Sequence, residues 1–169
     1  RDQYIQLALR LFRSGCAEAS ATAPRIINSV FAVAKKSGRQ RLIPNPANTN
    51  AVLPDPCHTS LPSPAVFASL ELPAGKTLFG AKYDLSDYYY QFILPPALRE
   101  LFGLEPVSVA ELRQYATEED LAGASWNSLS DDALIWPKFC RMPMGWAWSA
   151  YFAQSAHVTI IRRYAPHVR

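Results

Sequence analysis

The stretch Ala81–Leu94, AKYDLSDYYYQFIL, decides how the rest of this chain is interpreted. An apolar run that begins at Leu78 leads into Asp84, and this pattern predicts a buried strand that ends at a carboxylate. The Ser86-Asp87 pair is typical of turns and helix starts. A second apolar run, Phe92–Leu94, follows the three tyrosines. We therefore expect a strand, a carboxylate at its tip, one tight turn and a second apolar segment.

Length and composition indicate one folded unit. The 169 residues correspond to about one domain, and 49% hydrophobic and 12% aromatic residues favour a folded chain over disorder. The chain begins at Arg1 without a methionine and stops at Arg169 shortly after a helical pattern, so we expect a piece of a longer protein. Most of its prolines fall between Pro44 and Pro106, which predicts irregular connections there rather than long helices.

The three cysteines, Cys16, Cys57 and Cys140, share no metal-type spacing and are odd in number. They support neither a disulfide framework nor a zinc site, and a reduced, intracellular setting is expected. The Cys57-His58 pair has no second pair nearby, so it predicts a loop position rather than a metal site. No window reaches the roughly 18 apolar residues of a membrane span, and we expect no membrane partner.

Charge is divided along the chain in the order basic, acidic, basic. Residues 1–50 hold eight Lys and Arg against two acids, and residues 133–169 hold five against none. Residues 100–132 carry eight acids and one basic residue, Arg113. This order suggests a polyanion lying against the first and last thirds, away from the acidic stretch, although charge alone favours the alternative. Solvated faces without a ligand are the alternative.

Local patterns predict the elements of the first half. Tyr4–Phe12 has the spacing of a short helix that ends at Ser14-Gly15. Ile26–Val33 is dense in β-branched and aromatic residues and predicts a strand, with a basic turn and a return strand that begins at Leu42. Residues 44–64 predict an irregular crossing segment, and Ala65–Leu72 predicts a short helix.

The second half predicts two capped helices and a longer one. Ser108–Glu111 and Thr117–Asp120 have capping-box patterns, which predict two short surface helices in an insertion. The Asp131-Asp132 pair is placed in a loop or cap rather than in a catalytic cluster. Phe139–Pro143 predicts a short strand, followed by a turn at Met144-Gly145-Trp146 and a helix over residues 147–164.

Three of these segments contain sequence motifs whose order along the chain is informative. Val30–Ile43, VFAVAKKSGRQRLI, is followed nine residues after Arg41 by Asn50. Asp84–Gln91 reads DLSDYYYQ, and Met142–Trp146 reads MPMGW, with Ser149, Phe152 and Gln154 after it. Together they resemble the fingers and palm of reverse transcriptases of retroelements, and the paired tryptophans and long insertion are similar to divergent eukaryotic forms.

The resemblance implies an α+β fold of reverse-transcriptase type, with an antiparallel palm sheet backed by helices, and an incomplete one. It implies a single partial domain over residues 1–169. Residues 26–78 would form the fingers hairpin and its connecting segment. Residues 79–169 would form the palm, with an acidic insertion at about 104–137.

The resemblance also implies an RNA-directed DNA polymerase that uses two Mg²⁺ or Mn²⁺ ions, because nucleotidyl transfer needs hard cations held by carboxylate and carbonyl oxygens. Asp84 would be the catalytic carboxylate and a metal ligand, and the carbonyl of Leu85 another ligand. Tyr89 would be the steric gate that excludes a ribose 2′-hydroxyl. The nucleotide-binding residues would be Lys35, Lys36, Arg41, Asp87, Tyr88, Tyr89, Met144 and Gly145.

The implied partners are an RNA or DNA template with its primer and deoxynucleoside triphosphates. The aromatic-x-Asp-Asp motif that supplies the remaining carboxylates is expected after the second helix, and we find it nowhere in the 169 residues. The thumb and a ribonuclease H region are likewise expected elsewhere in the parent protein, so this chain alone should be inactive. Asn45, Ala47 and Met144 depart from the usual pattern, the first two in the fingers and the third in the nucleotide contacts.

Two other functions remain open from the sequence. The palm of an RNA-copying RNA polymerase is disfavoured by Tyr89, because such an enzyme must admit the 2′-hydroxyl. A domesticated or decayed remnant would bind nucleic acid or a protein partner without catalysis.

Overall fold

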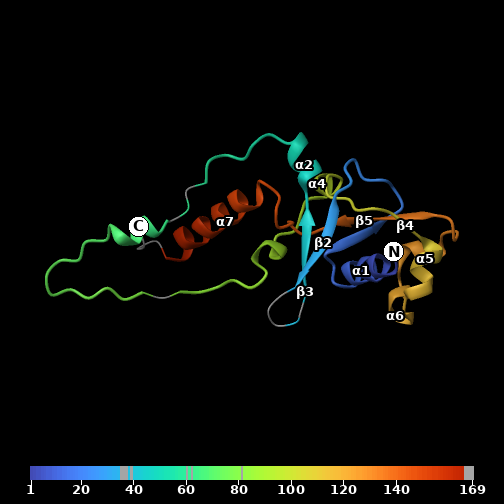
Figure 1. The fold of residues 1–169 in the computed structure, drawn as a ribbon, viewed down its shortest axis with the longest axis horizontal. Coiled ribbons are helices and arrows are strands. Elements are labelled where there is room, and N and C mark those ends of the chain that lie inside the picture. The colour runs from blue at the N-terminus through green and yellow to red at the C-terminus, as the bar shows by residue number, and fades with distance from the viewer. Residues whose placement is uncertain (35–37, 39, 60, 62, 81, 166–169) are drawn as a thin grey trace.

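The structure, a computed structural model, describes residues 1–34, 38, 40–59, 61, 63–80 and 82–165. Helices surround two small antiparallel sheets, which confirms the predicted α+β class at this coarse level (Figure 1). The first sheet has the strand order β1-β5-β4, and the second is the pair β2-β3. No helix in the described ranges is long and apolar enough to cross a membrane.

The chain begins with helix α1, Asp2–Arg13, as predicted. Its apolar positions recur at helical spacing, so Ile5 and Leu9 are buried in one hydrophobic core, while Leu11 is buried in another. Burial of each such side chain stabilises the fold by about 1.5–3 kcal/mol. The helix ends at Ser14, and Gly15 follows with φ of 64°, the left-handed conformation that glycine adopts without strain.

The first sheet is built around its central strand, β5, Leu134–Phe139. β1, Ala17–Ser20, pairs with β5 in antiparallel register, with Ala17 opposite Phe139. The short β4, Val107–Ser108, pairs along the other edge. The strand predicted at Phe139–Pro143 is therefore wrong in position, because β5 ends at Phe139 and Arg141 forms only an isolated bridge with Ile93. The preceding run supplies the buried strand, with Ile135 and Phe139 in the core.

The predicted hairpin forms from β2, Ser29–Ala34, and β3, Gln40–Asn45. Val33 lies opposite Arg41, and Gly38 in the turn has φ of 77°. Lys35 and Lys36 lie outside the described residues. The base of the hairpin is fixed by Asn28 and Thr49, both buried, which hydrogen-bond to each other and to the Leu101 carbonyl.

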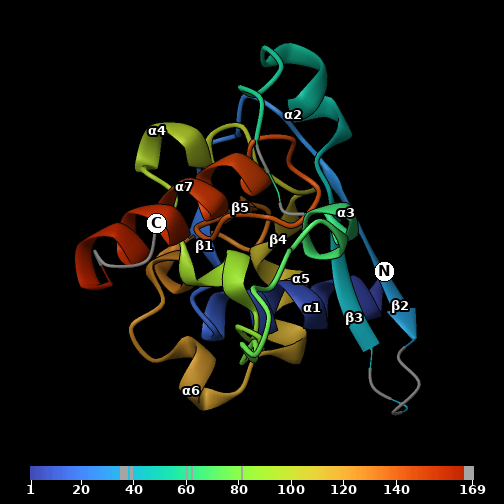
Figure 2. The same ribbon diagram turned by 90° about the vertical axis from the view of Figure 1, so that its left-hand side faces the viewer.

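Short helices and a long exposed arm occupy the Pro-rich middle, in agreement with its composition. We call residues 53–87 the arm, which extends away from the rest of the molecule (Figures 1 and 2). The helices before, within and after the arm are α2, Ala47–Val52; α3, Pro64–Ala68; the 3-10 helix η1, Tyr88–Gln91; and α4, Pro96–Arg99. Cys57 and His58 lie in a coil of the arm, as predicted.

Both predicted capping boxes are present. Ser108 and Glu111 cap α5, Val109–Tyr115, and Thr117 and Asp120 cap α6, Glu118–Leu121. The prediction of two surface helices is wrong for α5. Val109 and Leu112 are fully buried in a core formed with α1, β4, β5 and the 3-10 helix η2, Ser125–Ser128. The apolar residues between the acids account for this, since they continue the amphipathic pattern of a core helix.

The last helix, α7, Ser149–Tyr164, confirms the predicted helix after the glycine turn. Its first turns pack onto a second core through Ser149 and Ala153. That core also contains Phe102, Phe139 and Trp146. This second core lies under the segments that resemble polymerase motifs, so it sets their relative positions.

Candidate functional site

Two of the three resembling segments are neighbours in space. The N–H of Leu94 donates to the carbonyl of Cys140 at 2.8 Å, and the N–H of Met142 donates to the carbonyl of Phe92 at 3.0 Å. Ile93 and Arg141 form an antiparallel bridge between these two bonds. The segment after Asp84 and the segment before Gly145 are therefore joined by backbone hydrogen bonds.

The third segment, the hairpin with its connection, contacts the turn at Gly145. Asn50 Nδ2 donates to the Gly145 carbonyl at 3.0 Å, and Asn50 Oδ1 accepts from the N–H of Ala147 at 3.0 Å. Gly145 has φ of 98°, and a Cβ built there would lie 3.3 Å from Pro46 Cδ. Glycine thus permits both the conformation of this turn and its close approach to the end of β3.

The tyrosines after Asp84 form the 3-10 helix η1. Asp87 precedes it in the left-handed conformation, with φ of 50°, and the N–H of Tyr90 donates to the Asp87 carbonyl at 2.9 Å. The hydroxyl of Tyr88 donates to the Ala153 carbonyl of α7 at 3.1 Å. Partial burial raises the pKa of Tyr88, so this hydroxyl stays protonated and remains a donor. Tyr89 is half-buried beside it against the second core.

The expected buried strand before Asp84 is wrong. Residues 76–85, as far as they are described, form an exposed coil, in which Phe79 is 91% exposed and Tyr83 87%. A β-prone segment becomes a strand only where another strand satisfies its N–H and C=O groups. Neither sheet of the described residues includes this segment as a strand. Asp84 and Leu85 accordingly lie on the exposed arm.

The other predicted nucleotide-binding residues are placed as follows. Arg41 is exposed on β3, and Asp87 is exposed at the start of η1. Met144 is half-buried and Gly145 exposed in the turn before α7. The turn predicted at residues 144–146 is thus confirmed in position, whereas its contact with nucleotide stays a prediction.

The residues that could hold a metal ion do not complete a two-metal site. Asp84 and the carbonyl of Leu85 offer oxygen atoms, which suit Mg²⁺ and Mn²⁺. In the part of the chain that the structure describes, no group of three or more His, Cys, Asp or Glu side chains could hold a metal. Two oxygen donors on an exposed coil do not fit the centre that the resemblance implies, so further ligands are required.

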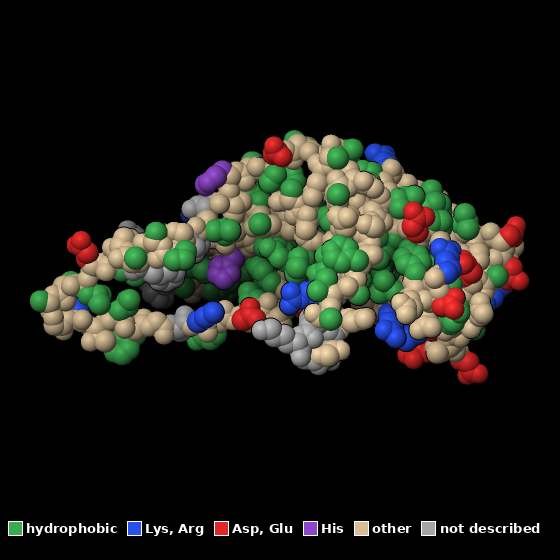
Figure 3. Space-filling view, viewed as in Figure 1, with side chains coloured by type: hydrophobic (Ala, Val, Ile, Leu, Met, Phe, Trp, Pro, Cys, Tyr) green, Lys and Arg blue, Asp and Glu red, His purple; other side chains and the backbone are tan. Residues whose placement is uncertain are grey.

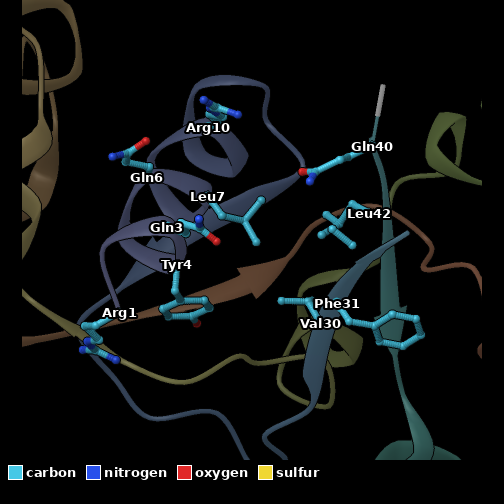
Figure 4. Close-up of a pocket in the computed structure, with 11 residues that line it drawn as sticks. Arg1, Gln3, Tyr4, Gln6, Leu7, Arg10, Val30, Phe31, Gln40 and Leu42 are labelled. Atoms are coloured by element: carbon cyan, nitrogen blue, oxygen red, sulfur yellow. The ribbon is translucent and has the colours of Figure 1, made fainter. Parts of the chain in front are cut away.

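A groove of about 600 Å³ lies between α1 and the hairpin (Figure 4). Its lining combines arginine, glutamine, aromatic and aliphatic side chains, and none of the described residues that line it is acidic. Phe31 is 51% exposed there. The residues that line the groove include Arg1, Arg10, Gln3, Gln6, Tyr4 and Phe31. Sequence reasoning missed this groove, because it joins residues from a helix and a hairpin that no local pattern connects.

The acidic stretch lies closer to the basic first third than expected. Arg1 pairs with Glu111 and Arg13 pairs with Asp120, at 2.7 and 2.6 Å. Figure 3 shows acidic and basic side chains side by side at the end of the molecule that carries α5 and α6. These two arginines are therefore engaged within the fold, and the separation of charges along the sequence is not a separation in space.

A scan against models of known protein families found no match to this chain, and a search of curated proteins found none either.

Proposed function

We propose that this chain is the fingers and part of the palm of an RNA-directed DNA polymerase, which adds deoxynucleotides to a primer on an RNA or DNA template. One observation carries the proposal. Asn50, after the hairpin, contacts the glycine turn, and residues 92–94, which directly follow the segment Asp84–Gln91, pair with residues 140–142, which lead into that turn. Neither contact was needed to recognise the motifs, so the two contacts support the proposal independently.

In this proposal Tyr89 selects the sugar. Its neighbour Tyr88 is anchored to α7 through the Ala153 carbonyl, and this anchor holds η1 against the second core. A ring on such a supported turn can reject a 2′-hydroxyl by steric contact. The backbone amides of Asp87 and Tyr88 would lie against the triphosphate, beside Met144 and Gly145.

Cations on the hairpin would bind the phosphates. Arg41 is exposed on β3, where its guanidinium can form two parallel hydrogen bonds to a phosphate. Lys35 and Lys36 keep the same proposed role from the turn. The groove beside α1 would receive single-stranded template, since aromatic faces stack with bases and arginines attract the backbone.

The two Mg²⁺ or Mn²⁺ ions of such an enzyme supply the Lewis acid for phosphoryl transfer. Asp84 and Leu85 would contribute two of the oxygen ligands. We infer that residues 78–85 pair with a strand that carries the other carboxylates and lies outside this chain. That pairing would bury Leu78 and Phe79 and bring Asp84 to the edge of a sheet.

A non-catalytic function is the second candidate. Asp84 lies on an exposed coil rather than on a strand tip, and this position favours a remnant that binds nucleic acid or a protein partner. Both candidates include nucleic-acid binding, so only a measurement of nucleotide incorporation separates them.

Sugar selection tests the proposed chemistry in the gene product that contains this chain. Tyr89→Ala should raise the incorporation of ribonucleotides relative to deoxynucleotides, because the ring is removed. Tyr89→Phe is the matched control, since it keeps the ring and should keep the discrimination. Unchanged discrimination in Tyr89→Ala would refute the gate.

Salt dependence tests the nucleic-acid interface with the 169-residue chain itself. Binding to a primer–template with a single-stranded overhang should weaken steeply with salt, and Arg10→Gln and Arg41→Gln should each reduce the slope by about 1. Lys76→Gln removes one charge from the arm and serves as the control. Equal slopes for all the variants would count against this interface.

A further inference from the structure

Cys16 and Cys140 lie opposite each other, one residue beyond the paired ends of β1 and β5. The register of β1 and β5 places Ala17 opposite Phe139, so the next pair outward is Cys16 and Cys140. The N–H of Cys140 donates to the carbonyl of Cys16 at 2.8 Å, which continues the ladder by one bond. Both thiols are free and half-buried, whereas Cys57 is exposed on the arm.

We propose that Cys16 and Cys140 form a reversible cross-strand disulfide when the protein meets a peroxide. Opposite residues that share a ladder hydrogen bond have Cα atoms about 5.5 Å apart, within the roughly 4.4–6.8 Å that a disulfide spans. The Cβ atoms of hydrogen-bonded pairs lie at the wide end of about 4.5–5.5 Å, so the two cysteines must move inward by about 1.5 Å to reach the separation of about 3.8 Å that disulfides favour.

The surroundings of the two thiols differ. Cys140 Sγ lies 3.7 Å from Glu18 Oε2, and Glu18 pairs with Arg99 at 2.6 Å. Burial, and then the nearby Glu18 carboxylate, raise the pKa of the Cys140 thiol. A raised pKa lowers the thiolate fraction, which makes Cys140 the poorer initial nucleophile. Cys16 is therefore assigned as the thiol that reacts first.

The reaction balances in two steps with hydrogen peroxide as the oxidant. The Cys16 thiolate attacks one peroxide oxygen and breaks the O–O bond, which gives a sulfenic acid and, after protonation, water. The Cys140 sulfur then displaces the sulfenic oxygen as a second water and forms the S–S bond. The two thiols together lose two protons and two electrons, and the peroxide is reduced to two waters.

The bond would tie the end of α1 to the strand that leads into the glycine turn. Cys16 follows α1 by three residues, and the Cys140 carbonyl accepts from Leu94 on its other side. A covalent bond at this position restrains residues 140–142, the segment that pairs with residues 92–94. The proposal rests on the strand register and not on the polymerase function.

Peptide mapping of the 169-residue chain tests this inference. After treatment with hydrogen peroxide, alkylation and digestion with trypsin, residues 14–25 and 139–141 should appear as one linked peptide. The chain mass should fall by two hydrogen atoms, and alkylation should be lost at both cysteines in the same molecules. A thiol reductant should restore both sites. The same linked peptide should form in Cys57→Ser, which removes the exposed thiol.

Denaturant provides the matched control. Loop closure in an unfolded chain favours cysteines that are close in sequence, so Cys16 should then link preferentially to Cys57. A Cys16–Cys140 link formed under native conditions and replaced by Cys16–Cys57 in urea supports the proposal. Under native conditions, retained alkylation of both thiols, a link through Cys57 instead, or oxidation to separate sulfinic acids would overturn it.

Discussion

The side-chain amide of Asn50 holds the backbone turn at Gly145. Its Nδ2 donates to the Gly145 carbonyl at 3.0 Å, while its Oδ1 accepts from the next residue but one, Ala147, at 3.0 Å. One amide thus satisfies a carbonyl and an N–H of the same turn. The connection that follows the β2-β3 hairpin and the turn before α7 are joined at this point.

Asn50→Ala should destabilise the fold by about 1–2 kcal/mol, because two hydrogen bonds, each contributing about 0.5–1 kcal/mol net, are lost to solvent. Chemical denaturation measures the change. Asn45→Ala is the control from the same hairpin, where the side chain donates one bond to Ser29, and it should cost less. A larger loss for Asn45→Ala would contradict the bridging role of Asn50.

Gly145→Ala should destabilise the chain by about 1–3 kcal/mol. The new Cβ adds strain at φ of 98° and contacts Pro46 Cδ at 3.3 Å and the Pro44 carbonyl oxygen at 3.4 Å. Gly123→Ala separates the two effects, since Gly123 has φ of 77° with open space around it. Thermal unfolding of both variants should show the larger loss for Gly145→Ala. Equal losses would mean that the approach of the hairpin contributes nothing.

Substitution of Glu100 should destabilise the fold more than substitution of its partner, Lys138. The Lys138 side chain is 2% exposed and its Nζ lies 2.6 Å from Glu100 Oε1. Glu100→Gln leaves a buried ammonium without its carboxylate and should lower the free energy of unfolding by about 2 kcal/mol. This is less than the ~3–5 kcal/mol expected when one partner of a fully buried pair is removed, because Glu100 is 34% exposed. Lys138→Met removes the buried charge itself and should cost less than Glu100→Gln. Denaturation in which Lys138→Met is the less stable variant would refute this account.

Acid should destabilise the protein through two carboxylates. The Arg1 guanidinium holds the pKa of Glu111 at about 2, and Arg13 holds the pKa of Asp120 at about 2. Both values lie below those of the unfolded chain, so the stabilisation is present above about pH 4.5 and is lost as the pH falls toward 2. Melting temperatures measured between about pH 6 and about pH 2 record this loss.

The double variant Glu111→Gln, Asp120→Asn is the control for the acid effect. It should be less stable at neutral pH, and its melting temperature should decline less steeply through the acid range. A decline as steep as that of the unsubstituted chain would assign the acid sensitivity to other groups.

Elements with local signals were predictable from the sequence. The capping boxes that begin at Ser108 and Thr117 each depend on two residues that are three positions apart in the sequence, and the structure contains both capping boxes. The turn at Gly145 and helix α7 follow from a glycine and a run of apolar residues at helical spacing. Each of these is decided within one or two helical turns.

Features that depend on distant partners were not predictable. The segment before Asp84 has the composition of a strand, yet no strand pairs with it in the described residues, and Phe79 stays exposed. The capping-box pattern at Ser108 predicts a surface helix, whereas Val109 and Leu112 of that helix pack in a core with residues of α1. Asn50 was recognised by its spacing from Arg41, but its contact with Gly145 required the fold.

Primer extension by the gene product that contains this chain tests the central claim most directly. Asp84→Asn and Asp55→Asn each neutralise one exposed carboxylate on the arm, so neither should alter folding. We expect Asp84→Asn to reduce deoxynucleotide incorporation by on the order of 1,000-fold, since it removes charge that binds the catalytic metal, and Asp55→Asn to leave incorporation nearly unchanged. Undiminished incorporation in Asp84→Asn would contradict the assignment of this carboxylate, and no incorporation by the unsubstituted protein would contradict the proposed polymerase function.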